Sequence, residues 1–193
     1  MKIVIINYGA GNIQSIKFAI QRLGYEAVLS NDAAEIKAAD KVIFPGVGEA
    51  SSAMQKLRES GLDSLIPQLT QPVLGICLGM QLMCNSSEEG NTRGLGIFDI
   101  DVVKFNHGVK VPQIGWNQIS ELQGDLFTDV IENEYIYLVH SFYAPICECT
   151  IAQSTYGLEY TTALHKGNFY GTQFHPEKSS ATGEKILENF LKL

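Results

Sequence analysis

The chain has 193 residues, of which 45% are hydrophobic, and its formal net charge is −7. This length and composition suit a sizeable buried core, and we expect one domain over residues 1–193. The negative charge, without any basic block in the sequence, argues against nucleic acid and anionic lipid as partners. A small neutral or zwitterionic substrate fits better.

The first residues, MKIVIINYGAG, carry one lysine before a short apolar run that breaks at Asn7. Such a run is too short for the core of a signal peptide or for a membrane span, so we expect a cytoplasmic protein. Cysteines in that compartment are normally reduced, and we interpret Cys84, Cys147 and Cys149 as small buried hydrophobic residues. We expect no metal and no cofactor.

The first half of the chain alternates strand-like and helix-like patterns, as βαβ units around a parallel sheet do. Four apolar segments predict strands: KIVIIN, YEAVLS, KVIFPG and PVLGI. Isoleucines at helical spacing before Gly24 predict a first helix, a short helix follows Asp32, and one or two more lie within 54–69.

The second half reads as short strands separated by turn residues, in IFDIDVVKF, EYIYLVH, TTALHKG and NFYGTQF. A last helix is predicted from about Thr182 to Leu191, with its apolar residues on one side. The predicted fold is therefore α/β, with a largely parallel central sheet flanked by helices and a mixed or antiparallel second sheet in the C-terminal half.

The segment VLGICLGMQ, residues 73–81, places Cys77 where a strand turns sharply into a helix, as in a nucleophile elbow. Gly75 and Gly79 would leave space for the turn. A helix starting near Leu78 would point its positive end at the sulfur and favour the thiolate, and the Leu78 amide could donate to an oxyanion. A buried structural cysteine in a glycine-flanked turn would give the same pattern, so a base is needed to decide.

His175 is the favoured base because it ends the apolar segment NFYGTQF and is followed by a proline and Glu177. The proline takes the chain out of the strand ladder, and the carboxylate can turn back toward the imidazole. The other histidines are weaker candidates: we interpret His107 and His165 as solvated, and His140, at a strand end, as a possible structural histidine.

Two loops follow predicted parallel strands and therefore lie at the same sheet edge as the elbow. FPGVG could supply a second oxyanion donor, although a plain Pro-Gly turn is the alternative. GAGNIQ, residues 9–14, looks like a dinucleotide fingerprint, with Asp32 near the acidic position. Gln14 replaces the third small residue of that fingerprint, so we expect the loop to face a partner or a product instead.

GICLGMQ and FHPE resemble the two hallmark segments of the triad-type, class I glutamine amidotransferases. Further segments resemble, in order from residue 6 to residue 178, the family of glutaminase subunits of imidazole glycerol phosphate synthase: NYGAGNI, FPGVG, SEEG, VPQIGWN and YLVHSF. The resemblance implies a flavodoxin-like amidotransferase fold and a role in histidine biosynthesis.

The resemblance also implies roles for single residues. Cys77 would attack the side-chain amide of glutamine, His175 would act as base and then protonate the departing ammonia, and Glu177 would orient the imidazole. Val47 and Leu78 would supply the oxyanion donors. A γ-glutamyl thioester would form, and water would then release glutamate.

By the same resemblance, one group of residues would hold the glutamine or line its pocket: Gly46, Gln81, Glu89, His140, Ser141 and Phe142. A second group would meet a (β/α)8-barrel synthase subunit in a heterodimer, where the ammonia would be used to make imidazole glycerol phosphate and AICAR: Asn12, Gln113, Trp116, Asn117, Tyr137 and Lys178. Many relatives have His at position 113 and Tyr at position 142, so hydrogen bonds assigned there do not transfer.

Several alternatives remain at this point. The chain could be the glutaminase of another ammonia-channelling synthase, such as pyridoxal phosphate synthase, although VPQIGWN argues against it. A hydrolase acting alone would place its acid before the histidine. A non-catalytic module would not need Cys77, His175, Glu177 and Gln81 together. Trp116 could be a core residue, but its Gly and Asn neighbours favour an exposed loop end.

Overall fold

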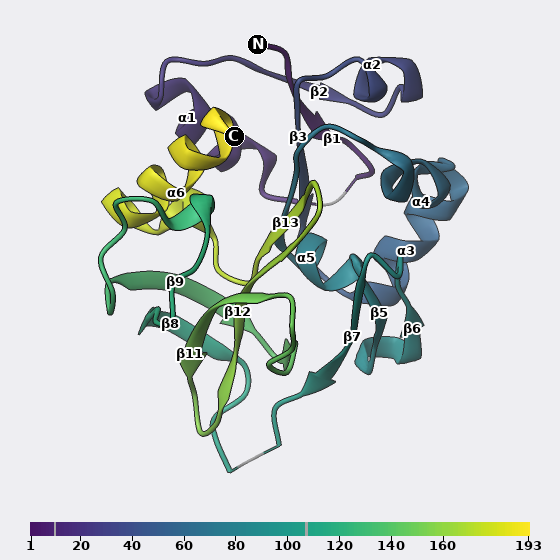
Figure 1. Cartoon of the computed structure of the whole chain (residues 1–193). Helices are drawn as coiled ribbons and strands as arrows, with labels where there is room; N and C mark the ends of the chain where they lie inside the picture. The colour runs from purple at the N-terminus through teal and green to yellow at the C-terminus, as the bar shows by residue number, and fades with distance from the viewer. Residues whose placement is uncertain (10, 107) are drawn as a thin grey trace.

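The computed structural model describes residues 1–9, 11–106 and 108–193. Ala10 in the GAGNIQ loop and His107, interpreted above as solvated, lie outside the described residues. A central seven-stranded sheet has the order β11-β12-β13-β4-β3-β1-β2 (Figure 1). Its strands are β1 (Ile3–Ile6), β2 (Ala27–Ser30), β3 (Lys41–Gly46), β4 (Val73–Cys77), β11 (Thr150–Thr155), β12 (Glu159–Lys166) and β13 (Phe169–Thr172).

Five neighbouring strands, β2, β1, β3, β4 and β13, run parallel. β1, β3 and β4 are buried along their whole length, as strands covered on both faces are. β12 and β11 extend the sheet in antiparallel pairing. The predicted fold class is confirmed. The sequence pattern grouped β13 with the strands of the second half, but β13 pairs with β4 and completes the parallel part of the sheet.

Helices cover both faces of this sheet (Figure 1). Apolar side chains of α1 and α6 pack on one face, and those of α2, α3, α4 and α5 on the other. The helices are α1 (Ile13–Arg22), α2 (Ala33–Lys37), α3 (Ala50–Glu59), α4 (Leu62–Leu65), α5 (Leu78–Leu82) and α6 (Ser180–Lys192), with short 3-10 turns η1 (Ile66–Gln68), η2 (Glu89–Asn91), η3 (Asp125–Phe127) and η4 (Pro176–Lys178). Within the described ranges, none of these helices has the length and apolar character that a membrane crossing requires.

The helix boundaries follow from local sequence signals. Gly24 follows α1 with φ +84°, a left-handed conformation that glycine adopts without steric cost. Asp32 caps α2, because its side-chain oxygen accepts a hydrogen bond from the Glu35 amide at 2.8 Å. The Glu35 carboxylate pairs with Lys2. These caps fix the lengths of the connections that return the chain to the parallel sheet.

Two smaller sheets occupy the lower part of the molecule in Figure 1. One has the order β10-β7-β5-β6 and the other pairs β8 with β9. Their strands are β5 (Cys84–Ser87), β6 (Thr92–Arg93), β7 (Phe98–Lys104), β8 (Gln113–Gln118), β9 (Tyr135–His140) and β10 (Phe142–Tyr143). They supply the walls that close over the carboxyl edge of the central sheet.

The prediction that Trp116 lies at a loop end is wrong. Trp116 lies within β8, where it pairs with Tyr137 of the antiparallel strand β9. The pairing with β9 outweighs the weak strand preference of Gly115 and Asn117. The indole is nevertheless 54% exposed, so Trp116 is not a core residue either.

Candidate active site

Cys77 is the last residue of β4, and α5 begins at the next residue. Its backbone has φ 53° and ψ −110°, a strained conformation for a residue with a Cβ. The predicted need for small neighbours is confirmed, since a Cβ on Gly79 would collide with the Phe44 carbonyl and one on Gly75 with the Met83 side chain. The sulfur therefore sits on a tight corner at the edge of the sheet.

The helix that starts at Leu78, as predicted, is short. α5 spans only Leu78–Leu82, little more than one turn. Because the helix dipole sums over aligned peptides, so short a helix contributes little to holding a negative charge on Cys77. The charged and polar side chains around the sulfur must supply most of that stabilisation.

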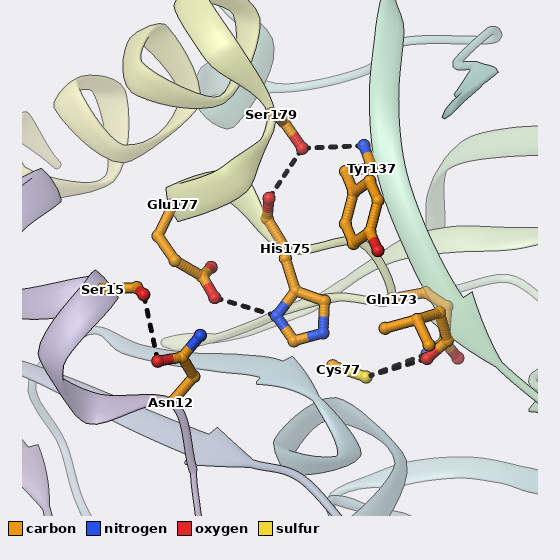
Figure 2. A network of polar contacts seen from close by, with 9 residues as sticks. Asn12, Ser15, Cys77, Tyr137, Gln173, His175, Glu177 and Ser179 are labelled. Carbon is orange, nitrogen blue, oxygen red and sulfur yellow. Dashed lines mark hydrogen bonds and ion pairs between the residues drawn. The ribbon is translucent and has the colours of Figure 1, made fainter. Parts of the chain in front are cut away.

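His175 lies beside Cys77 because β13 runs parallel to β4, with Thr172 opposite Ile76. The chain then turns into η4, which carries Glu177 back toward the imidazole. His175 Nδ1 is 2.9 Å from Glu177 Oε1, and the two side chains are only 3% and 0% exposed (Figure 2). The predicted pairing of these two residues is present in the structure.

The electrostatics of this pair favour a protonated imidazole. Burial lowers the pKa of His175, but hydrogen bonds to Cys77 and Glu177 and the negative charge of both partners outweigh it and raise the pKa to about 10. At neutral pH His175 therefore carries a proton on each ring nitrogen. A positive imidazolium beside the sulfur favours the thiolate, which is the nucleophilic form of cysteine.

A pocket of about 310 Å³ opens beside the sulfur. Both predicted oxyanion residues and nearly all predicted glutamine-pocket residues line it, together with the sulfur and the imidazole. The lining includes Val47, Cys77, Leu78, Gln81, Glu89, His140, Ser141, Phe142 and His175. Gly46 does not line the pocket; it pairs with Cys77 between β3 and β4, where a Cβ would collide with the backbone of α5.

Polar groups at the back of the pocket are held by the Phe142 carbonyl. It accepts hydrogen bonds from Gln81 Nε2 at 2.9 Å and from His140 Nδ1 at 2.8 Å. Burial lowers the pKa of His140 to about 4, with the nearby His175 charge adding to the effect and the hydrogen bond to Phe142 opposing it. His140 is therefore neutral at pH 7, and its buried Nε2 has no hydrogen-bond partner among the described residues.

Glu89 lies half-buried at the pocket, and its Oε2 accepts a hydrogen bond from the Ala50 amide at 2.9 Å. Burial raises the pKa of this carboxyl, the Ala50 hydrogen bond opposes the rise, and the neighbouring Glu49 adds to it. The carboxylate thus ties the SEEG segment to the first turn of α3 and places a negative group at the pocket.

Two residues that the sequence pattern did not indicate contact Cys77 or His175 (Figure 2). Gln173 is fully buried, and its Nε2 is 3.8 Å from Cys77 Sγ. Ser179 Oγ accepts from the Tyr137 amide at 2.9 Å and donates to the His175 carbonyl at 2.6 Å. Strand alternation could have indicated Gln173, which lies two positions before His175; a buried serine gives no comparable signal.

The residues expected to meet a partner are only partly brought together. Trp116 and Tyr137 form an edge-on aromatic pair with ring centres 6.0 Å apart, and the exposed Lys178 lies over the Tyr137 ring at 5.8 Å. A groove of about 710 Å³ beside them is lined by Trp116, Glu177 and Lys178, with charged residues of α6. Glu177 thus lies between this groove and the His175 imidazole.

Other expected interface residues have different positions. Gln113 is not a surface residue: it is 4% exposed, and its Oε1 accepts a hydrogen bond from the buried Tyr160 hydroxyl at 3.0 Å. The Asn117 amide donates to the Thr155 carbonyl, and the Asn12 side chain accepts from Ser15 at the start of α1. Figure 2 shows Asn12 below Glu177.

Two minor expectations about other residues have mixed outcomes. His165 is not simply solvated; it is half-buried, stacks on Tyr170 with ring centres 4.2 Å apart, and its Nε2 lies 2.9 Å from the Gly167 carbonyl. Cys84 is fully buried in the core, as expected, while Cys147 and Cys149 are half-buried against it.

Comparison with known proteins identifies the family. Residues 4–193 match the family described as glutamine amidotransferase class-I. The chain belongs to this family. The amidotransferase is 57% identical to the imidazole glycerol phosphate synthase subunit HisH of Bacteroides fragilis strain YCH46, and 50% identical to the HisH of Pectobacterium atrosepticum strain SCRI 1043, in each case over the full length of both chains. The resemblance inferred from the motifs is confirmed.

Solved structures support the fold of the amidotransferase. A putative GMP synthase protein from Thermoplasma acidophilum superposes with a TM-score of 0.78 at 22% identity, covering 100% of this chain and 92% of the other. The structure of PurLQS from Thermotoga maritima gives 0.74 at 16% identity, with 99% and 97% covered. At these identities the likeness shows the fold alone.

Proposed function

We propose that this amidotransferase is the glutaminase subunit of imidazole glycerol phosphate synthase. The observation that carries the proposal is the pocket in which Cys77 and the buried His175–Glu177 pair meet. It hydrolyses L-glutamine to glutamate and ammonia, and the ammonia passes to a (β/α)8-barrel subunit that makes imidazole glycerol phosphate and AICAR. The full-length identity to proteins named HisH favours this synthase over pyridoxal phosphate synthase.

The pocket offers complementary groups for the two ends of glutamine. Both amide hydrogens of Gln81 are used, by the Phe142 carbonyl and by Gln173, so its carbonyl oxygen is the atom left to accept from a ligand. That oxygen and the Glu89 carboxylate suit the α-ammonium group of an amino acid. The side-chain amide would then reach the sulfur at the inner end of the pocket.

The chemistry follows from the imidazolium–thiolate pair. The Cys77 thiolate adds to the amide carbon, and the electron pair of the C=O bond moves to oxygen, where the amides of Val47 and Leu78 stabilise it. His175 gives its proton to the amide nitrogen as the C–N bond breaks, releasing ammonia and leaving a γ-glutamyl thioester. His175 then takes a proton from water as it attacks the thioester, and glutamate and the free thiolate result.

The partner is proposed to dock on the exposed aromatic and basic side chains beside the triad. Trp116 is 54% exposed, and with Tyr137 and Lys178 it presents a rigid aromatic pair and a cation. Large aromatic residues of this kind commonly anchor protein interfaces. The half-buried Asn12 and Asn117 are proposed to contribute at its margin, while Gln113 supports it only from beneath.

The test is glutamine-dependent and ammonia-dependent synthesis by the complex with its barrel subunit. Cys77→Ala is expected to abolish glutamine hydrolysis and to leave synthesis from added ammonium salt intact, because only the ammonia source is lost. Residual glutaminase within tenfold of the parent would overturn Cys77 as nucleophile, since removing one member of such a unit normally costs orders of magnitude. If no barrel subunit co-purifies with the chain, the proposed partner is wrong.

A further inference from the structure

The Phe142 carbonyl determines how two buried side-chain amides point. Gln81 Nε2 lies 2.9 Å from this carbonyl and 2.9 Å from Gln173 Oε1. Because a carbonyl oxygen only accepts hydrogen bonds, the Gln81 atom that faces Phe142 must be the amide nitrogen. Its second hydrogen then points at Gln173, which must present its oxygen. The amide nitrogen of Gln173 is therefore the atom that faces Cys77.

Gln173 is held by hydrogen bonds at its backbone and at its side chain. Its backbone amide donates to the Thr162 carbonyl at 2.8 Å, and its side chain is fully buried. Gln173 directly follows β13, and Figure 2 shows it beside Cys77, where its Nε2 lies 3.8 Å from Sγ. A donor fixed in this way needs no reorganisation when negative charge forms on the sulfur.

The contact of the sulfur with a backbone carbonyl has the opposite preference. The Val139 carbonyl oxygen is 3.9 Å from Cys77 Sγ. A thiol can donate its hydrogen to this oxygen, whereas a thiolate has no hydrogen to donate and is repelled by it. The N–H of Gln173 favours the thiolate, because hydrogen bonds to charged groups are stronger than those to neutral groups. A donor is needed here to offset the carbonyl.

We propose that Gln173 is a catalytic residue of this amidotransferase, whose amide N–H stabilises the Cys77 thiolate while Gln81 holds that amide in its productive orientation. The inference rests on the proposed function, since it takes Cys77 as the nucleophile. Gln81 also lines the glutamine pocket, so substrate contact and thiolate stabilisation share one hydrogen-bonded chain.

The remaining titratable groups around the sulfur are unchanged by the variants that test this role. The imidazolium, which lies directly before η4, faces the sulfur together with its carboxylate partner in η4. Burial and the charge of the sulfur raise the pKa of the tyrosine in the loop after β1, which stays neutral. The histidine of β9 is neutral, and a carboxylate lies at the pocket. These groups are His175, Glu177, Tyr8, His140 and Glu89.

The experiment is the pH profile of Cys77 alkylation by iodoacetamide without glutamine, followed by mass spectrometry of the peptide that contains Cys77. Only the thiolate reacts, so the midpoint reports the thiol–thiolate equilibrium and is independent of glutamine binding. Gln173→Met, similar in size but without a donor, is expected to shift the midpoint upward by about one pH unit. Gln81→Met is expected to give a smaller upward shift, because the Gln173 amide is then free to turn.

Asn189→Leu is the matched control, since this buried amide donates to the Leu126 and Thr128 carbonyls away from the pocket. Its midpoint should equal that of the wild type. An unshifted midpoint in folded Gln173→Met overturns the inference; if that variant is unfolded by circular dichroism, an unshifted midpoint in Gln81→Met overturns it. If wild-type Cys77 reacts no faster at neutral pH than Cys147, the nucleophile of the proposed function fails instead.

Discussion

At the scale of single residues, the protonation of His175 depends on its two neighbours. Its raised pKa, about 10, comes from contacts with Cys77 and Glu177 that outweigh the effect of burial. Because the pKa is raised above the ordinary value near 6.5, the protonated form stabilises the fold fully below that pH. This contribution is lost as the pH rises through about 10.

The first prediction concerns this coupling. Cys77→Ala removes a hydrogen-bond partner and a negative charge, so the pKa of His175 is expected to fall well below that of the wild type. Imidazole NMR signals followed from pH 5 to pH 10 measure it. His140 is the internal control, since its pKa of about 4 keeps it neutral throughout this range in both proteins. An unchanged His175 titration would show that the thiol does not contribute to its protonation.

The second prediction concerns Glu177 as the residue that orients the imidazole. Glu177→Gln keeps an oxygen facing Nδ1 but loses the charge, so turnover is expected to fall about 10²-fold. Glutamine affinity, measured in the Cys77→Ala background, should stay nearly unchanged, because Glu177 does not line the pocket. If glutamine affinity fell as far as turnover does, Glu177 would be a binding residue instead.

Glu184→Gln provides the matched control for this experiment. Glu184 lines the same outer groove as Glu177 and pairs with Arg22 at 3.5 Å. The His175 imidazole contacts Glu177 and not Glu184. Glutamine turnover by the chain without its partner should therefore be the same for Glu184→Gln as for the wild type.

At the scale of elements, the corner between β4 and α5 stores backbone strain at Cys77. With φ 53° and ψ −110°, the residue occupies a region that glycine enters freely and other residues do not. The strand, the helix and the glycines on either side hold the backbone in this conformation. The strain is the structural cost of lifting the sulfur above the sheet edge.

The third prediction follows from this strain. Cys77→Gly should be more stable than Cys77→Ala by about 1 kcal/mol, because relief of strain exceeds the extra entropy that glycine gains in the unfolded chain. Urea unfolding of both variants measures the difference. At Cys84, a strand residue without positive φ, the order should reverse, with alanine the more stable. Equal stability of the two Cys77 variants would show that the corner is unstrained.

At the scale of the whole molecule, the pocket beside Cys77 and the groove beside Trp116 meet at the His175–Glu177 pair from two sides. His175 lines the pocket, and Glu177 lines the groove. Ser179 links the backbone of β9, which carries Tyr137, to the His175 carbonyl. A partner seated on the groove, as proposed above, would therefore contact elements that are hydrogen-bonded directly to His175.

The fourth prediction is that the isolated chain is a poor glutaminase and is activated by its liganded partner. Val47 is exposed at the pocket and does not adopt a positive φ, and turning its amide toward the oxyanion would cost free energy that a glycine would avoid. One missing oxyanion donor lowers turnover by about 10² to 10³. Activation requires the partner's ligand to favour the competent loop.

Steady-state glutamate production tests this in three conditions: the chain alone, with the barrel subunit, and with the barrel subunit plus its nucleotide-like substrate. The rate should rise mainly in the third. Equal rates in all three would mean that the loop around Val47 is already competent, and the steric argument from its Cβ would be wrong.

The sequence by itself determined much of the molecule. Apolar runs and helical spacing predicted the four N-terminal parallel strands, the helices between them and the last helix. This works because the buried apolar side chains of a strand or a helix leave a recognisable pattern in the sequence. The glycine-flanked Cys77 and the short segment from His175 to Glu177 indicated the residues that the structure brings together at the pocket. A tight turn, and a carboxylate two positions after a histidine, are local features of the sequence.

Only the tertiary structure decided which distant segments meet. The parallel pairing of β13 with β4 brings Gln173 to Cys77, 96 positions earlier in the chain, and sequence periodicity says nothing about strand partners. The same holds for Gln113 and Trp116. Pairing of β8 with β9 turns Gln113 inward, against the expectation from the resemblance, and leaves Trp116 exposed on a strand rather than at a loop end. Burial patterns are encoded locally, whereas register and partners are set by packing of the whole core.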